Sequence, residues 1–219
     1  MIRMRSFRSR ILALAVGLVT LVLATTVIAV VVKARAEVDR EASLQLRSAA
    51  STAREALKFR GNQLTSAADV LTSDFGFRDA VAGGDTPTLA SAIANHRARI
   101  GADVLIVLDP AGRTISSSLS TLSVRARADL AELVASDADG QLLQLYRLID
   151  GHPYQLVLAP VLAPDTVGWA AIGFALDNRV AVEMSRLLGV EVSFVARDGA
   201  GPAFVASSLP DSARAGLAD

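Results

Sequence analysis

The segment GADVLIVLDPAGRTISSS, residues 101–118, contains the change of period that decides the fold. Its first half, 103–109, is an apolar run rich in β-branched residues, which is typical of a buried strand. A turn signal at 110–112 follows, and residues 113–118 return as a second strand. The segment therefore predicts an antiparallel strand pair.

Downstream of this pair, the pattern alternates helix and strand. Apolar spacing predicts a helix over 124–135. Strands are expected at 141–149, 153–162 and 167–176, and the short turns between them favour antiparallel neighbours. The next helix, 177–189, has a capping aspartate at its start and a glycine at its end.

The same motifs recur in the last part of the chain. GADVLIV from Gly101 returns as GVEVSFV from Gly189, SSL at 117–119 returns at 207–209, and RADLA at 127–131 returns as RAGLA at 214–218. Order and spacing are nearly kept, which predicts two similar modules, at 79–176 and from 177 onward. Because the second lacks counterparts of residues 132–176, we expect a fragment or a product truncated inside its second module.

Upstream, a long helix is expected over 33–78, followed by a Gly83-Gly84 turn and a shorter helix begun by Asp85 or Thr86. Two interpretations of its heptad seam stay open: the face it packs on its own domain, or a parallel homodimer contact. Arg60 is the one discordant residue in the seam, whose members are Leu46, Ala50, Ala53, Leu57, Leu64, Ala67 and Leu71.

Residues 11–32, ILALAVGLVTLVLATTVIAVVV, contain no charge and no proline. As a helix they would reach about 33 Å, enough for a hydrocarbon core of about 30 Å. Four arginines within 1–10 predict a cytoplasmic N-terminus, which places the chain after about residue 33 outside a bacterial inner membrane. A cleaved signal peptide is the alternative, but the apolar run is longer than a signal core of about 7 to 15 residues.

Composition excludes several classes of function. The net charge is zero overall, but the residues beyond 35 carry −6, which argues against a nucleic-acid partner. Cysteine is absent, so neither disulfides nor thiolate metal sites are expected. The only histidines, His96 and His152, have no metal-ligand spacing, while Asp109 and Asp150 stand in turns. We expect no enzyme activity in this chain, no metal and no cofactor.

Residues able to bind a small solute are few, because pockets for metabolites are mainly apolar with a few placed polar groups. Arginine suits a carboxylate, and Tyr146 and Tyr154 stand on neighbouring strands, where they could share one face of the sheet. The alternative is that the aromatic residues pack the core and the arginines are solvated. The candidates are Arg78, Arg97, Arg99, Tyr146, Tyr154 and Trp169.

A span, a long helix and two α+β modules with antiparallel sheets together resemble the double Cache sensory domains of bacterial transmembrane receptors, whose modules are PAS-like. The run LTSDFGFRDAVAGGDTPTLASAIANHRARIGADVLIVLDPAGRTISSS, residues 71–118, is similar to the subgroup that precedes GGDEF and EAL domains or histidine kinases. The resemblance implies a dimeric extracytoplasmic sensor whose distal module binds a small molecule between its sheet and the covering helix or loop. It also implies a second span and a cytoplasmic output domain, which this sequence does not contain.

The sequence therefore favours the ligand-sensing region of a membrane receptor that controls a cyclic-di-GMP enzyme or a histidine kinase. Two other classes stay open. One is a membrane-anchored module that binds a solute and delivers it to a partner. The other is a structural envelope protein whose long helix only dimerises.

Overall fold

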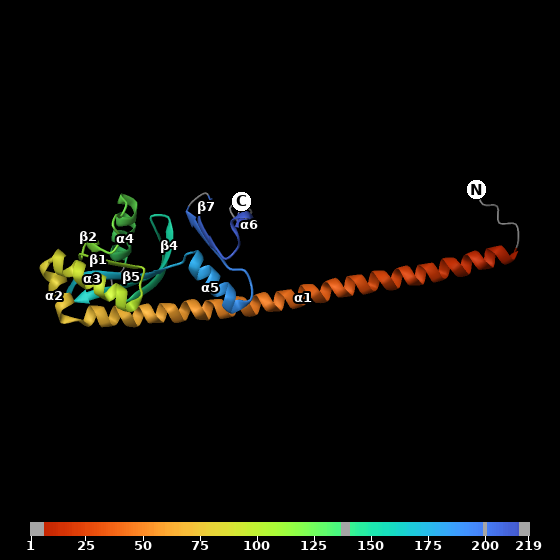
Figure 1. Cartoon of the computed structure of the whole chain (residues 1–219), viewed down its shortest axis with the longest axis horizontal. Helices are drawn as coiled ribbons and strands as arrows, with labels where there is room; N and C mark the ends of the chain where they lie inside the picture. The colour runs from red at the N-terminus through yellow and green to blue at the C-terminus, as the bar shows by residue number, and fades with distance from the viewer. Residues whose placement is uncertain (1–6, 137–140, 199–200, 215–219) are drawn as a thin grey trace. The chain divides into compact units, whose positions relative to one another are not determined.

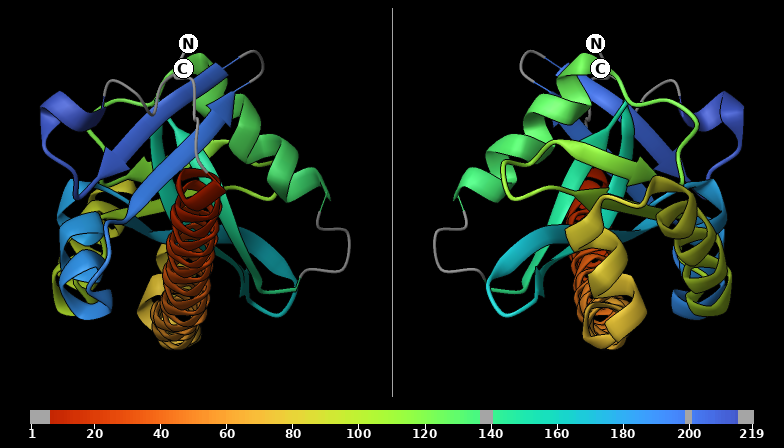
Figure 2. Two further views of the ribbon diagram at one scale, coloured as in Figure 1. Left: turned by 90° about the vertical axis from the view of Figure 1, so that its right-hand side faces the viewer. Right: turned by 90° about the vertical axis from the view of Figure 1, so that its left-hand side faces the viewer.

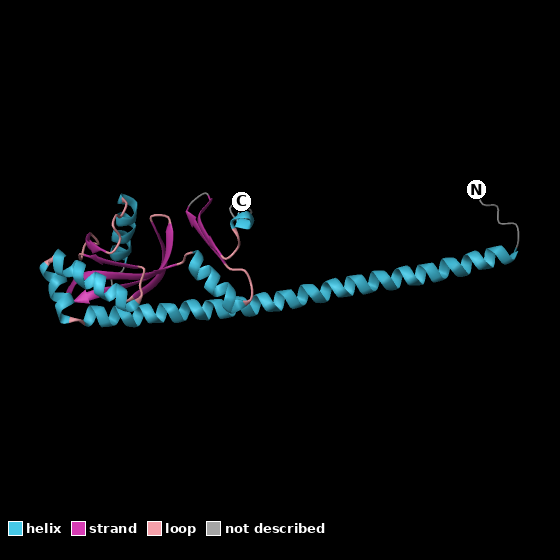
Figure 3. Cartoon of the chain, in the orientation of Figure 1, coloured by secondary structure: helices cyan, strands magenta, loops and turns pink. Residues whose placement is uncertain are grey.

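The computed structural model describes the backbone of residues 7–136, 141–198 and 201–214. Figures 1 and 3 show its helices and strands. In several helical and strand stretches, residues 7–16 among them, the side chains lie outside the description. In chain order the elements are α1 (Phe7–Ser73), α2 (Phe75–Gly83), α3 (Thr86–Ile100), β1 (Val104–Leu108), β2 (Thr114–Ser117), α4 (Val124–Ser136), β3 (Leu143–Ile149), β4 (His152–Leu162), β5 (Thr166–Ala175), α5 (Asn178–Leu188), β6 (Ser193–Asp198), β7 (Gly201–Ser207) and α6 (Asp211–Arg214).

The chain divides into two units, Met1–Ala50 and Ser51–Asp219. The described part of the first unit is helical from Phe7 to its end. Judged on the residues whose description is complete, no helix is both long and apolar enough to cross a membrane. The expected span, 11–32, lies partly outside those residues.

The second unit is built on a five-stranded sheet with the order β2-β1-β5-β4-β3. Every neighbouring pair in it is antiparallel, as the short turns predicted. A separate two-stranded sheet is formed by β6 and β7. The α+β class with antiparallel sheets, expected from the change of period, is confirmed.

Two apolar cores cover the two faces of the five-stranded sheet. Residues from α1, α2 and α3 pack on one face, against Leu105 and Val107 of β1. The other face, which carries Val104, Ile106 and Leu108, packs on α4. Figure 2 shows α4 on one side of the sheet and α2 and α3 on the other. The unbroken apolar run of β1 is thus explained, because this strand is buried on both faces.

Helix α1 ends at Ser73, and a further short helix, α2, occupies Phe75–Gly83. The separation is made by Asp74, whose carboxylate accepts a hydrogen bond from Phe77 N at 2.8 Å and so caps α2. The long helix expected over 33–78 therefore ends earlier, and the residues after Asp74 begin a second helix that the pattern did not predict. Asp85 caps α3 as expected, accepting from Thr88 N at 3.2 Å.

Part of the heptad seam of α1 is buried in the domain's own core. Of its members, Leu64 and Leu71 are fully buried against the sheet, as is Ala68, the residue after the seam position Ala67. This part of the seam therefore follows the first of the two interpretations, a helix face packed on its own domain.

The repeated motifs make the same hydrogen bonds in both places. In the first, Ser118 Oγ accepts from Leu105 N, Ser118 N donates to Leu105 O, and Leu119 N donates to Ser117 Oγ. In the second, Ser208 exchanges the same two bonds with Val192, and Leu209 N donates to Ser207 Oγ. The sequence match aligns Leu105 with Ser193, whereas the residue that makes these bonds in the second copy is Val192, one position earlier.

Candidate functional site

A cavity of about 950 Å³ lies between α4, the edge strand β3, the β3–β4 turn and β6. This volume falls within the range of about 300 to 1,000 Å³ that is usual for small-molecule sites. Apolar side chains supply much of the wall, among them Leu57 of α1, Leu133 of α4 and Phe194 of β6. All the residues that line the cavity belong to the second unit.

Five charged side chains line the cavity. Helix α4 supplies Arg125, Asp129 and Glu132, which share one face because they are spaced four and three residues apart. Strand β3 supplies Arg147, and the turn after it supplies Asp150. Two guanidinium groups and three carboxylates thus surround one space, so the cavity can bind both anionic and cationic groups of a ligand.

The β3–β4 turn is tied to the start of α4 by Asp150. Its two carboxylate oxygens accept from Ser123 N at 3.2 and 3.3 Å, and Ser123 Oγ in turn accepts from Ala126 N at 3.1 Å. The turn residues Asp150 and Gly151 have φ of 50° and 80°, the left-handed region that a two-residue hairpin requires. The expected turn role of Asp150 is confirmed, and the carboxylate also fixes one end of the cavity wall.

Tyr146 is the one sequence candidate of the six that lines this cavity. Its side chain is half exposed, and the part that is removed from water raises the pKa of its phenol. In the β3–β4 ladder Tyr146 stands opposite Gln155, whereas Tyr154 stands opposite Arg147.

The two tyrosines consequently lie on opposite faces of the sheet, and the expectation that they share a face is wrong. The reason is the register set by the two-residue turn, which pairs Ile149 with His152. In this register Tyr146 and Tyr154 are offset by one residue, so their side chains point to opposite faces. Tyr154 packs beside the core that faces α4. Desolvation, and then the negative charges of Asp103, Asp150 and Asp177, raise the pKa of its phenol.

The other candidates are dispersed over the domain. Trp169 is 4% exposed and belongs to the core under α4. Arg78 Nη1 donates to Leu162 O at 3.3 Å, beside a smaller hollow near the end of α1. Arg97 and Arg99 are exposed on α3, where Arg99 Nη2 lies 3.0 Å from His96 Nδ1.

Sequence reasoning missed the charged residues of α4 and Arg147. The spacing of 125, 129 and 132 was available as a signal, but many exposed helix faces carry such a pattern. Their convergence on β3 depends on how the sheet folds. Among the residues that the structure describes, no group of three or more His, Cys, Asp or Glu could hold a metal ion.

Comparison with known protein families gives a match over residues 39–215 to the profile described as "Double sensory domain of two-component sensor kinase". The chain belongs to the double Cache family. Curated protein sequences give no match to this double Cache chain.

Two solved structures show the same fold at low sequence identity. The periplasmic domain of Vibrio cholerae LuxQ matches with a TM-score of 0.53 and 15% identity, over 74% of this chain and 78% of that one. The sensor domain of the V. cholerae histidine kinase DctB matches with a TM-score of 0.53 and 17% identity, over 78% of this chain and 67% of that one. A weaker match, to the Escherichia coli DcuS sensor domain, has a TM-score of 0.46 and 12% identity, over 61% of this chain and 97% of that one.

The double Cache assignment fixes the general role of the chain. It is a sensory region of a signal-transduction protein, since the family description names a double sensory domain of two-component sensor kinases. The PAS-like architecture expected from the order of elements agrees with this assignment.

Proposed function

We propose that this double Cache domain senses a small solute that occupies the cavity between α4, β3 and β6. The observation that carries the proposal is the cavity itself, with about 950 Å³ of space and with charged groups of both signs beside apolar side chains in its wall. Of the sequence candidates, Tyr146 is the one we assign to the solute. A cavity of this kind favours a ligand-binding role over a purely structural envelope protein.

The same proposal includes the membrane topology. Residues 11–32 form the anchor, residues 1–10 remain in the cytoplasm, and the chain from about residue 33 lies in the periplasm. The support is the uncharged stretch of 22 residues and the arginines before it. The domain boundaries follow: a signalling helix at 33–78, a membrane-distal Cache module at 79–176 and the start of a proximal module at 177–219.

We further propose a homodimer formed through the first part of the α1 seam. Leu64 and Leu71 are occupied by the domain's own core, but Leu46 and Ala50 are exposed. Close approach of alanine positions would allow two α1 helices to pack there. The output is a histidine kinase, which the family description favours over a cyclic-di-GMP enzyme.

A thermal-shift screen of the full chain in detergent micelles tests the binding proposal. The panel contains amino acids, carboxylates, amines and sugars. A solute present at 100 times its Kd stabilises the folded state by about 2.7 kcal/mol, which for a domain of this size raises Tm by roughly 5 to 11 °C.

The matched variants are Val195→Trp and Leu162→Trp, since both residues are 46% exposed and only Val195 lines the cavity. Val195→Trp should abolish the thermal shift given by the active solute, and Leu162→Trp should retain it. A panel without any active solute, or an equal shift in both variants, would refute the proposed site.

A further inference from the structure

Helix α1 lies close to the sheet at Gly61. A Cβ atom at this position would lie 1.4 Å from Gln144 Nε2 and 2.7 Å from Gln155 Nε2. The space that any other side chain would need is therefore filled by two glutamines, one from β3 and one from β4. Glycine is required here by contact and not by backbone conformation.

Gln155 is fully buried, with 0% of its surface exposed. Its Nε2 donates to the main-chain oxygen of Leu57 at 2.8 Å, and its Oε1 is buried with no hydrogen-bond partner among the described residues. A buried, half-satisfied amide costs roughly 1 to 3 kcal/mol. An apolar residue would suit the stability of this core better, whereas a single buried amide is known to fix the register of packed helices.

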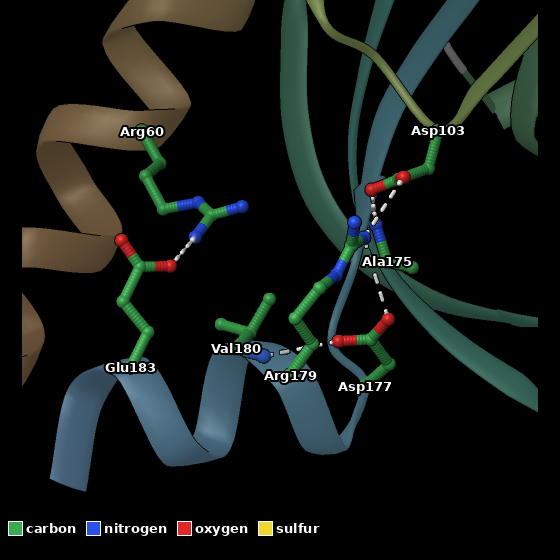
Figure 4. A network of polar contacts seen from close by, with 7 residues as sticks. All are labelled: Arg60, Asp103, Ala175, Asp177, Arg179, Val180 and Glu183. Carbon is green, nitrogen blue, oxygen red and sulfur yellow. Dashed lines mark hydrogen bonds and ion pairs between the residues drawn. The ribbon is translucent and has the colours of Figure 1, made fainter.

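The same turn of α1 contacts two further elements through Arg60. Its guanidinium lies 4.9 Å from the ring centre of Phe174, the residue opposite Gln155 in the β4–β5 ladder. Arg60 Nη1 also lies 3.9 Å from Glu183 Oε2 on α5, as Figure 4 shows. The discordant residue of the seam thus joins α1 to β5 and to the helix that leads toward the second module.

Helix α5 is itself held to the sheet at this joint. Asp103 Oδ2 accepts from Ala175 N at 2.8 Å, and Arg179 Nη2 lies 3.4 Å from both Asp103 Oδ1 and Asp177 Oδ2. Asp177 caps α5 by accepting from Val180 N at 3.0 Å (Figure 4). A movement of β5 relative to α1 would therefore also move α5.

The cavity reaches this turn of α1 directly. The side chain of Leu57 lines the cavity, and the main-chain oxygen of Leu57 accepts the Gln155 bond. Tyr146, also in the wall, stands opposite Gln155 in the β3–β4 ladder. A solute in the cavity would thus contact Leu57 and Tyr146, the two residues that adjoin the buried amide of Gln155.

We propose that Gln155 and Gly61 form a latch that sets the register of α1 against the sheet, and that occupancy of the cavity acts on this latch through Leu57. The inference rests on the proposed function for its trigger. The latch itself can be tested without any solute, so the two can fail separately.

The experiment measures the distance between α1 and α4 in the full chain by pulsed EPR. Because the chain has no cysteine, Asn62→Cys and Ala128→Cys introduce two unique label sites, both exposed. Gln155→Met removes the bond and the unsatisfied oxygen while roughly keeping the volume. Gln144→Met is the matched control, since it makes the same change at an exposed neighbour.

The expected result is a Tm within about 4 °C of the wild type for Gln155→Met. We expect its distance distribution to broaden or move by roughly 1.5 Å or more, the rise of one helical residue. Gln144→Met should match the wild type. The double variant Gly61→Ala/Gln144→Ala, which crowds Gln155 alone, should reproduce the broadening.

Wild-type distributions in both Gln155→Met and the double variant would overturn the latch. So would a Tm loss above about 10 °C in Gln155→Met with an unchanged distance in the folded fraction, because Gln155 would then be a packing residue only. A failed solute screen would leave the EPR result standing and would remove only the trigger.

Discussion

Replacing Gly61 by alanine tests the close approach of α1 to the sheet. Alanine is favoured over glycine in a helix by about 0.8 to 1.0 kcal/mol. The added methyl displaces the amide of Gln144, which is exposed and can turn away into water. It also crowds the amide of Gln155, which is buried and cannot leave without losing its bond to Leu57 O.

The lost bond leaves buried amide donors unpaired, at a cost of roughly 1 to 3 kcal/mol. The two effects oppose each other, so Gly61→Ala should be between about 0 and 2 kcal/mol less stable than the wild type. Gly83→Ala in α2 is the control, because no atom lies within 4 Å of the added Cβ. That variant should gain up to about 1 kcal/mol.

Urea denaturation of the full chain, followed by circular dichroism, gives both free energies of unfolding. The difference between the variants reports the contact of Gly61 with the two glutamines, because only Gly61→Ala places its methyl against other side chains. When Gln155 is already replaced by methionine, the loss of unfolding free energy caused by Gly61→Ala should be smaller by roughly 1 to 3 kcal/mol. If Gly61→Ala stabilises the chain as much as Gly83→Ala does, the reasoning about the buried amide is refuted.

Three further predictions follow from the structure. Both tyrosines of the chain should titrate above the ordinary pKa of about 10, because desolvation disfavours their charged forms. The unfolded chain ionises first, so the free energy of unfolding should be intact below pH 10 and fall as the pH rises past it; absorbance at 295 nm showing an ordinary titration would contradict this. Asp150→Ala should lower the free energy of unfolding by about 1 to 3 kcal/mol in urea through loss of its bonds to the start of α4, while the exposed Asp165→Ala should change it little; equal effects would count against the tie. Gly168→Ala should lower the free energy of unfolding by about 3 kcal/mol or more, because its Cβ would lie 2.5 Å from a main-chain oxygen of β1. The control Gly76→Ala, whose nearest neighbour is at 3.4 Å, should be tolerated in the same urea assay, and similar free energies of unfolding for the two variants would exclude the clash.

Local chemistry made most of the elements predictable. The β-branched run predicts β1, the short turns predict the antiparallel pairing of β3, β4 and β5, and Asp85 and Asp177 predict the starts of α3 and α5. Each of these signals is read from neighbouring residues alone. Helix α2 was missed because it is only nine residues long, contains Gly76 and Gly83, and lies between the capping residues Asp74 and Gly84, a composition typical of a loop. Its helical state depends on burying Phe77, Ala80 and Val81 against the sheet.

The candidate site was less predictable because it depends on contacts between distant segments. Tyr146 could be chosen by residue type, but its face of the sheet follows from the length of one turn. The heptad seam has the same spacing whether it packs on its own sheet or on a second copy, so the sequence could not separate the two. Gln155 and Gly61 carry no signal of their own, and only the fold brings them together.

The central claim is that a solute occupies the cavity beside Tyr146. With two tyrosines in the chain, fluorotyrosine labelling gives two ¹⁹F resonances, which Tyr154→Phe assigns. Tyr146 lines the cavity, whereas Tyr154 is not among the lining residues and packs beside the core under α4. A solute that raises Tm should shift the Tyr146 resonance saturably and leave that of Tyr154 in place. A shift of the Tyr154 resonance alone, or of neither resonance, would contradict the account.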